Sequence, residues 1–505
     1  MPVHSPSPFK QVSKYYGMKK YSIIIVAAVL FASCNKWLDV KPEAEITKDE
    51  LFKTESGFME ALNGVYTACA DKEAYGVELS SGLTEVLAQN YHIEAAQDKD
   101  GYKQTSLYNY ADLVLIERKD KVWRRLYNAI ANCNLILENL DKGTAPMTQL
   151  NKQLIRGEAL GLRAFLHFDL LRLFAPSYAS APGGKAIPYV TTFTNQVTPL
   201  STVTDALNKM VTDLTQAKDL LKTVDPILAA GYKVGYPGDT ASKELSAPVL
   251  FQQNRRHRLN YYAVCGTLAR VYLTLDKKQE ALANAAIVID AQKFPWTLEA
   301  DFIQADVKLK DRILYPELLF CFYDDWYEDV YVRRFEAGTA GFYLTSAAGD
   351  KLYEKGGIGG EDRRYSHWLQ YVDDNSGKRY ELQKYKRDKD TNRHPLVHPA
   401  IKLSEMYYIA AEAIWDTDPA KALGYLNFVR KKRGIITEVS TASKTVFLDE
   451  LVKEVRKETY GEGQLFYLYK RLNRGILQET GAVTNPSDKI FVLPMPNDEL
   501  EYGQR

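Results

Sequence analysis

Aromatic rings and carboxylates alternate in one short segment, residues 320–331. Six of its twelve residues are aromatic and four are acidic. A flat aromatic face can stack on the apolar face of a sugar ring, while carboxylates accept hydrogen bonds from its hydroxyl groups. The segment therefore predicts a ligand-binding surface. Its candidate contacts are Trp326, Tyr327, Tyr323 and Asp325, and Tyr91 and Tyr102 from an earlier stretch are candidates to complete the platform.

Other interpretations of this segment stay open. Alternation explains Phe320 and Phe322 as the buried face of a strand that ends at Asp324. Trp326 then lies in the following loop, where it either faces a ligand or packs that loop onto the scaffold. The acidic side chains in this segment offer oxygen ligands to calcium, or simply form a solvated loop.

Signatures of catalysis and of metal binding are sparse. The sequence lacks G-x-S-x-G, H-E-x-x-H and a Walker loop, and no G-x-G-x-x-G follows a strand. His394 and His398 are four residues apart, but Pro395 breaks the helix that would place both on one face. No cofactor or metal is predicted, and Glu412 and Arg163 are expected to form ion pairs between helices. Glycoside hydrolysis needs only two carboxylates placed by the fold, so a lipid-anchored glycan hydrolase that uses loop carboxylates remains the alternative.

The N-terminal segment predicts export and lipidation. Lys19 and Lys20 precede an apolar run, residues 21–31, and small residues lead to Cys34. As a helix this run extends about 16 Å, roughly half of a bilayer's hydrocarbon core, so a retained membrane span is the weaker alternative. We expect residues 1–33 to be a signal peptide and Cys34 to be acylated. Residues 1–17 suggest a misassigned start codon, because Met18 is the better start.

Composition favours a globular body with a net charge near zero, which follows a short tether, residues 34–48. The chain has 65 basic and 64 acidic residues, and nothing in it indicates nucleic-acid binding. Tyrosine is plentiful, with 34 residues against 19 phenylalanines, which suits surfaces that are half apolar and half wet. The remaining cysteines are far apart without a C-x-x-C spacing, and we expect buried free thiols at Cys69, Cys133, Cys265 and Cys321.

Helical periodicity dominates the body. Apolar residues recur at helical spacing in 50–70, 119–140 and 150–174. Small residues recur twelve positions apart after Ala269 and again after Ala410, as in tetratricopeptide repeats. We therefore expect a mainly α fold, a tetratricopeptide-repeat-like helical scaffold with long irregular insertions and a few short strands. The insertions are 71–112, 177–200, 226–254 and most of 294–399.

Several motifs, in this order along the chain, resemble the SusD/RagB family of outer-membrane nutrient-binding lipoproteins. No single motif is decisive, but their order together with the lipoprotein signal is specific. They are the CNKWLDVKPE start, the RGEALGLRAFLHFDLLRLF segment from Arg156, ARVYL from Ala269, IKLSEMYYIAAEA from Ile401, LNFVR from Leu426, YGEGQ from Tyr460 and LPMP from Leu493.

The resemblance implies a cell-surface lipoprotein, with residues 49–505 as a nutrient-binding domain that contains interrupted tetratricopeptide-like repeats. It implies binding without catalysis, a glycan or peptide ligand, and a SusC-like TonB-dependent outer-membrane transporter as partner. The chain departs from the family at Leu465 and Leu468, where an arginine and an aspartate are usual. Three residues apart on a helix, these positions face the same way, so packing replaces an ion pair.

Overall fold

The computed structural model describes residues 48–324, 327–336, 341–375, 377–387 and 392–503. By its internal contacts the chain divides into two units, 1–51 and 52–505. Only the short helix α2 (Lys48–Leu51) of the first unit is described. The predicted signal peptide, Cys34 and most of the predicted tether therefore lie outside the described residues. No described helix is long and apolar enough to cross a membrane.

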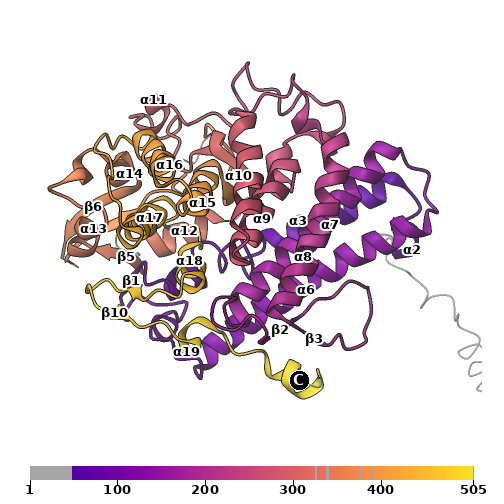
Figure 1. The fold of residues 1–505 in the computed structure, drawn as a ribbon, viewed down its shortest axis with the longest axis horizontal. Coiled ribbons are helices and arrows are strands. Elements are labelled where there is room, and N and C mark those ends of the chain that lie inside the picture. The colour runs from indigo at the N-terminus through magenta and orange to yellow at the C-terminus, as the bar shows by residue number, and fades with distance from the viewer. Residues whose placement is uncertain (1–47, 325–326, 337–340, 376, 388–391, 504–505) are drawn as a thin grey trace, which may run out of the picture. The chain divides into compact units, whose positions relative to one another are not determined.

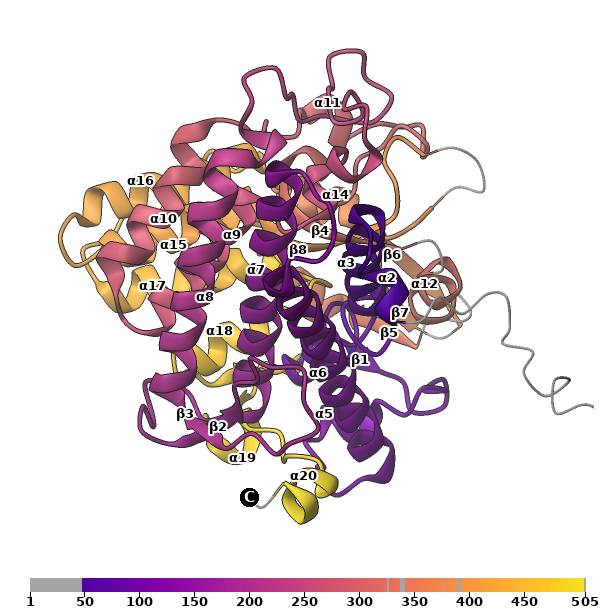
Figure 2. The same cartoon turned by 90° about the vertical axis from the view of Figure 1, so that its right-hand side faces the viewer.

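Residues 52–505 are built mainly from antiparallel helices (Figures 1 and 2). The long helices of the first half are α3 (Glu55–Ala70), α6 (Leu113–Lys142), α7 (Gln149–Phe174) and α8 (Val203–Val224). Those of the second half are α9 (Tyr261–Thr274), α10 (Lys278–Ala291), α15 (Leu403–Ile414), α16 (Pro419–Lys432) and α17 (Lys444–Glu458). The mainly helical fold predicted from the sequence is confirmed.

Local sequence signals set the ends of these helices. Asp112 begins α6 by accepting a hydrogen bond from the backbone N–H of Leu115, and Gly143 ends it with a left-handed φ of 65°. Thr148 begins α7 in the same way. Within α7, a Cβ at Gly157 would lie 2.7 Å from Cγ of Leu221, so glycine permits the close approach of α8.

The small residues that suggested repeats lie at helix–helix contacts. α9 packs against α10, and α15 packs against both α10 and α16. Ala269, Ala281 and Ala285 are fully buried in the first pair, and Ala410 and Ala422 are fully buried in the second. A small side chain lets two backbones approach closely, which explains the twelve-residue recurrence. Cys69, Cys133, Cys265 and Cys321 are all buried free thiols, as predicted.

The long insertion 294–399 is more ordered than predicted. It supplies β5 (Phe342–Thr345), β6 (Leu369–Asp374) and β7 (Gly377–Leu382), which join β1 (His92–Ile93) in an antiparallel sheet of order β1-β5-β7-β6. A second core of buried aromatic and aliphatic side chains packs around this sheet. The short helices α12 (Tyr327–Phe335), α13 (Ser346–Leu352) and α14 (Arg363–Trp368) complete the region.

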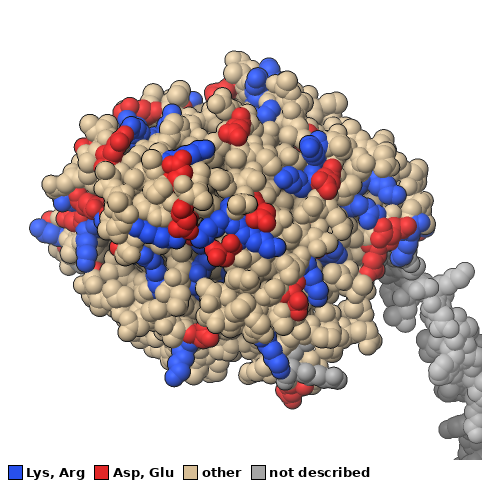
Figure 3. Space-filling view, viewed as in Figure 1, with Lys and Arg blue, Asp and Glu red and all other residues tan. Residues whose placement is uncertain are grey.

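β4 (Leu318–Tyr323) pairs antiparallel with β8 (Val397–Lys402) between the helices and this second core. We expected only alternate residues of this strand to be buried. Instead every residue from Leu318 to Phe322 is buried, because β4 is covered on both faces, and only Tyr323 at its end is exposed. Basic and acidic side chains intermingle over the face drawn in Figure 3, in keeping with the net charge of +1.

The remaining elements are short. They are α4 (Leu83–Leu87), α5 (Lys103–Ser106), α11 (Glu299–Phe302), α18 (Leu465–Arg471), α19 (Asp488–Phe491), α20 (Asn497–Tyr502), the strand pairs β2 (Lys185–Pro188) with β3 (Leu200–Thr202) and β9 (Ile476–Leu477) with β10 (Val483–Thr484), and the 3-10 turns η1 (Pro226–Leu228), η2 (Leu250–Gln252), η3 (Arg255–His257), η4 (Tyr315–Glu317) and η5 (Ile358–Gly360).

Candidate functional site

An open groove of about 970 Å³ lies where two of the insertions meet at the end of β4. We call it the Tyr323 groove. Its walls come from residues 236–245 of one insertion and from 308–309 and 392–395 of the other, with Asn254, His257 and Tyr323 between them. Its volume falls in the range typical of small-molecule and oligomer binding sites. One of the four candidate contacts of the acidic aromatic segment, Tyr323, therefore lies in a groove.

Tyr323 presents its side chain to solvent, with 53% of the residue exposed. Its ring stacks on the imidazole of His257, with ring centroids 5.9 Å apart and planes 25° apart. β4 holds the backbone of Tyr323 opposite Val397 of β8. Because the support is a buried strand, the exposed ring is positioned without a ligand present.

Two buried hydrogen-bonded contacts fix the loops of the groove. The Tyr236 hydroxyl donates to Oδ2 of Asp311 at 2.8 Å, which joins one insertion to the other. Nε of Arg256 donates to Oε1 of Glu244 at 2.8 Å, and both side chains are buried. Burial raises the pKa of Asp311 to about 6. These contacts tie irregular backbone to the scaffold, as a preformed site requires.

The polar groups of the groove have mixed charge. The Arg393 guanidinium lies 4.0 Å from the centroid of the Tyr236 ring. Its Nη1 lies 2.5 Å from Oδ1 of Asp301, and its Nη2 lies 4.0 Å from Oδ2 of Asp239. Asn254, Asn392 and Lys308 add further polar side chains, and Leu245 and Leu309 are about half exposed at its margin. Aromatic faces beside hydrogen-bonding groups suit the two sides of a sugar ring.

The two histidines of the groove are neutral at physiological pH. Burial, followed by the charge of Arg256, lowers the pKa of His257 to about 4. Burial, followed by the charge of Arg387, lowers the pKa of His394 well below its usual value. A neutral imidazole both donates and accepts hydrogen bonds, so the groove does not depend on histidine charge near neutrality.

Tyr91 and Tyr102 do not belong to a ligand platform, which corrects the prediction for both. Tyr91 is 5% exposed and its ring stacks on Phe342, with centroids 5.0 Å apart. Tyr102 is fully buried, and its hydroxyl donates to Oε1 of Glu78 at 2.8 Å. Both rings belong to the second core, and the Tyr102 hydroxyl has the hydrogen-bond partner that a buried tyrosine usually finds.

The other candidates near Tyr323 are only partly described. Asp325 and Trp326, and the side chain of Tyr327, lie outside the described residues. Asp324 is buried, and its Oδ2 lies 2.8 Å from Nε2 of His398. The Asp324 carboxylate therefore links β4 to β8. His394 and His398, the two histidines four residues apart, have different protein partners.

Tyr236, His257 and Arg393 line the groove but were not predicted from the sequence. Arg393 lies more than a hundred residues beyond Tyr236 and His257 in the chain, and none of the three belongs to a recognisable motif. The sequence indicated a binding role for them only in that they lie in, or next to, long insertions on a rigid scaffold. Arg255 and Arg256, which adjoin His257 in the chain, are fully buried, and Arg255 pairs with Asp225, so these two arginines stabilise the fold.

The two charged residues expected to pair between helices do so. Nη2 of Arg163 on α7 lies 2.7 Å from Oδ1 of Asp213 on α8. Nη1 of Arg471 on α18 lies 2.6 Å from Oε1 of Glu412 on α15. Both arginines form bidentate contacts, so these acidic and basic groups stabilise helix packing.

Comparison with known proteins agrees with this architecture. A SusD-like family model described as "Starch-binding associating with outer membrane" matches residues 36–226. Two SusD-like proteins of Formosa agariphila are 26% and 24% identical over 218 and 215 residues. Residues 36–226 thus match the SusD-like family. The aligned regions span 39% of the length of each of these relatives.

Solved structures of SusD-like proteins share the fold of nearly the whole chain. A SusD superfamily protein of Bacteroides thetaiotaomicron has a TM-score of 0.70 and 23% identity, covering 89% of this chain and 98% of that one. A protein of Bacteroides vulgatus described as a putative sugar-binding protein has a TM-score of 0.68 and 23% identity, covering 89% and 96%. The motif segments that begin at Arg156, Ala269 and Leu426 lie in α7, α9 and α16, whereas the insertions build the Tyr323 groove.

Proposed function

We propose that this SusD-like protein is a cell-surface lipoprotein that binds an oligomeric nutrient, foremost a glycan, and delivers it to a TonB-dependent outer-membrane transporter. The observation that carries the binding role is the exposed Tyr323 ring in a groove bordered by hydrogen-bonding side chains. The match to a family model described as starch-binding and the likeness to a putative sugar-binding protein support a carbohydrate as ligand. We also propose Trp326, Tyr327 and Asp325, which adjoin Tyr323 in the chain, as ligand contacts.

Delivery rests on the lipid anchor and on the tether. Acyl chains on Cys34 hold the protein at a membrane, and residues 34–48 extend at most about 50 Å. The body, residues 49–505, can then move over a neighbouring barrel while it stays anchored. The outer membrane is the proposed location, and neither nucleic acid nor a cofactor is part of the proposal.

A panel of purified glycans and peptides tests the binding role. We expect at least one oligosaccharide to bind, as measured by calorimetry, and we expect incubation with the protein not to shorten that oligosaccharide. Shortening of a glycan would instead favour the alternative, a lipid-anchored hydrolase that uses loop carboxylates. Binding of peptides alone would show that the ligand is a peptide and not a glycan. Binding of neither class would contradict the proposal.

Extraction in mild detergent tests the partner. We expect the protein to co-purify with a large β-barrel of the TonB-dependent, SusC-like class. Recovery only as a free monomer across several detergents would contradict delivery to a transporter, but would leave the binding role intact.

A further inference from the structure

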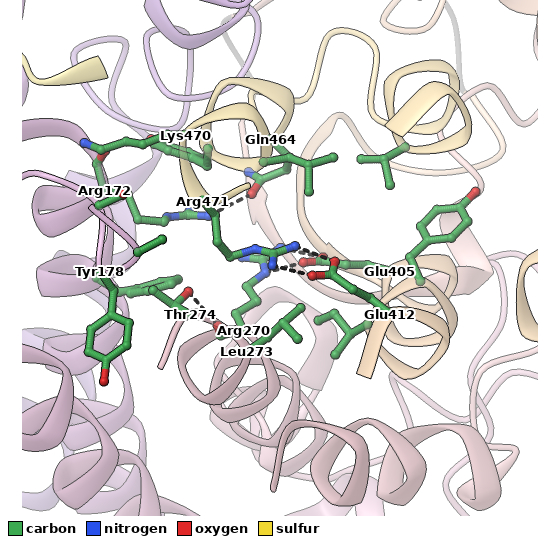
Figure 4. A pocket seen from close by; sticks show the side chains of 18 of the residues that line it. Arg172, Tyr178, Arg270, Leu273, Thr274, Glu405, Glu412, Gln464, Lys470 and Arg471 are labelled. Carbon is green, nitrogen blue, oxygen red and sulfur yellow. Dashed lines mark hydrogen bonds and ion pairs between the residues drawn. The ribbon is translucent and has the colours of Figure 1, made fainter. Parts of the chain in front are cut away.

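A second cavity lies within the helical scaffold, among α7, α9, α15, α17 and α18 (Figure 4). We call it the scaffold cavity. It measures about 130 Å³ and shares no lining residue with the Tyr323 groove. Much of its wall is apolar and includes Phe168, Leu171, Leu273, Ile409, Val455 and Leu468. Leu468 is one of the two positions at which the sequence departs from the pattern expected of the SusD/RagB family.

Two ion pairs cross the polar side of the scaffold cavity. Arg270 on α9 donates to Glu405 through Nε at 2.5 Å and through Nη2 at 2.6 Å. Arg471 on α18 donates to both carboxylate oxygens of Glu412 at 2.6 Å. Figure 4 shows these four side chains converging in the pocket. The two carboxylates are therefore already engaged by arginines.

Some donors at the scaffold cavity have no hydrogen-bond partner among the described residues. Nη1 of Arg270 makes no hydrogen bond with any part of the chain that the structure describes, although Arg270 is only 5% exposed. The hydroxyl of Tyr467, which also lines the cavity and is 5% exposed, has none either. A buried donor without an acceptor is costly, and such groups in a native structure call for a physical explanation. A ligand that brings an acceptor into the cavity would satisfy them.

The charge of the wall favours an acceptor that is anionic. Four cationic side chains and two carboxylates line the cavity, namely Arg172, Arg270, Lys470 and Arg471 against Glu405 and Glu412. Arg172 is paired with Asp169 behind the wall. Lys470 donates to the backbone carbonyls of Arg172 and Phe491 at 2.7 and 2.8 Å and forms no ion pair with any described residue. Burial lowers the pKa of Lys470 to about 7, so its amine is partly charged at neutral pH.

The size of the cavity sets the size of the ligand. An apolar cavity of about 150 Å³ in another protein accommodates one benzene ring. Water is a poor occupant of the apolar part, because an ordered water needs two to four polar partners. The scaffold cavity thus suits one small ring or a short branched chain, with a polar end near Arg270.

We propose that the scaffold cavity binds a small organic acid, whose carboxylate accepts a hydrogen bond from Nη1 of Arg270 and whose apolar body contacts Phe168, Leu273 and Leu468. This site is separate from the Tyr323 groove and does not depend on the function proposed for that groove. The ligand would contact α7, α9 and α18 at once, so its binding must stabilise the helical scaffold by mass action.

Benzoate is the probe that tests this proposal. We expect millimolar benzoate to raise the melting temperature of the purified protein and to bind in calorimetry at least tenfold more tightly than benzyl alcohol or acetate. Benzyl alcohol keeps the ring without the charge, and acetate keeps the charge without the ring. Equal binding of benzyl alcohol would overturn the assignment of an acid, and no binding of any probe would overturn the site.

Variants that fill the cavity locate the binding. Leu468→Trp should abolish benzoate binding, whereas Leu500→Trp on the exposed surface of α20 should leave it unchanged. If circular dichroism shows that Leu468→Trp is unfolded, Val455→Phe, from α17, fills the same cavity. Benzoate affinity that is unchanged in a folded cavity-filling variant would show that benzoate binds elsewhere and would overturn the proposal.

Discussion

The side chain of Glu85 on α4 accepts a hydrogen bond from the backbone N–H of Gly463 at 2.7 Å, across 378 residues of sequence. It also accepts one from the N–H of Gly461 at 2.9 Å. Gly463 has a φ of +74°, and a Cβ there would lie 2.3 Å from the carbonyl oxygen of Leu79. Only glycine fits this turn, which docks the C-terminal region onto the first insertion.

Glu85 should make the stability of the protein depend on pH. Burial raises the pKa of its carboxyl to about 7, from an ordinary value of 4.5. The folded state then binds more protons than the unfolded state between these values, so stability falls as pH rises from 4.5 to 7, by roughly 3 kcal/mol. We expect Glu85→Gln to reduce this slope in urea unfolding at pH 4.5, 5.5 and 7. The exposed Glu117→Gln should keep the wild-type slope, and an unaltered slope in Glu85→Gln would contradict the prediction.

A buried arginine provides a second test of what stabilises the fold. Arg433 is 2% exposed and pairs with Glu317 at 2.6 Å and with Glu458 at 2.7 Å. Arg433→Met leaves both carboxylates without this partner in the interior, so we expect a loss of about 3–5 kcal/mol in the free energy of unfolding.

Lys431→Met is the matched control for this variant. Lys431 pairs with Glu438 at 2.5 Å, but both side chains are more than half exposed. An exposed ion pair contributes less than about 1 kcal/mol. The free energy of unfolding of both variants is measured by chemical denaturation. Equal losses would show that burial does not account for the contribution of Arg433 to stability.

Local patterns in the sequence were sufficient to predict the helical scaffold. The periodicity of α7 and the small residues at Ala269 and Ala410 depend only on nearby positions, so they are visible without a structure. The sheet formed by β1, β5, β7 and β6 was not predicted, because its strands are short and because β1 pairs with β5 across about 250 residues, although β6 and β7 are neighbours in the chain. Strand pairing over such separations leaves little local trace.

The candidate site could be predicted only in part. Tyr323 was recognised from its local aromatic and acidic neighbours, and it does line a groove. Tyr91 and Tyr102 were assigned wrongly, because a tyrosine in an insertion serves equally well in a core when its hydroxyl has a partner such as Glu78. Tyr236 and Arg393 reach the groove only through the tertiary fold, which no spacing in the sequence encodes.

Tyr323 should contribute to ligand affinity without contributing to stability. Loss of one stacking surface costs about 1 kcal/mol, so Tyr323→Ala should weaken binding of the cognate oligosaccharide roughly fivefold. Tyr323→Phe keeps the ring and should retain most of the affinity. Tyr502→Ala, which removes a tyrosine that is 70% exposed on α20, should change neither affinity nor melting temperature. Full affinity in Tyr323→Ala would remove this ring from the proposed binding surface.

Cys34 should be the only membrane anchor. Its thiol follows an apolar run too short to span a bilayer, and each CH₂ group of an attached acyl chain contributes about 0.8 kcal/mol when buried in a membrane. Serine cannot take its place in thioether formation, so Cys34→Ser should either stay unprocessed or appear in the soluble fraction. The measurement is cell fractionation combined with mass spectrometry of the N-terminus. A mutant of mature size that still sediments with membranes after a high-salt wash would show that another segment or a partner holds the protein there, and would contradict anchoring through Cys34 alone.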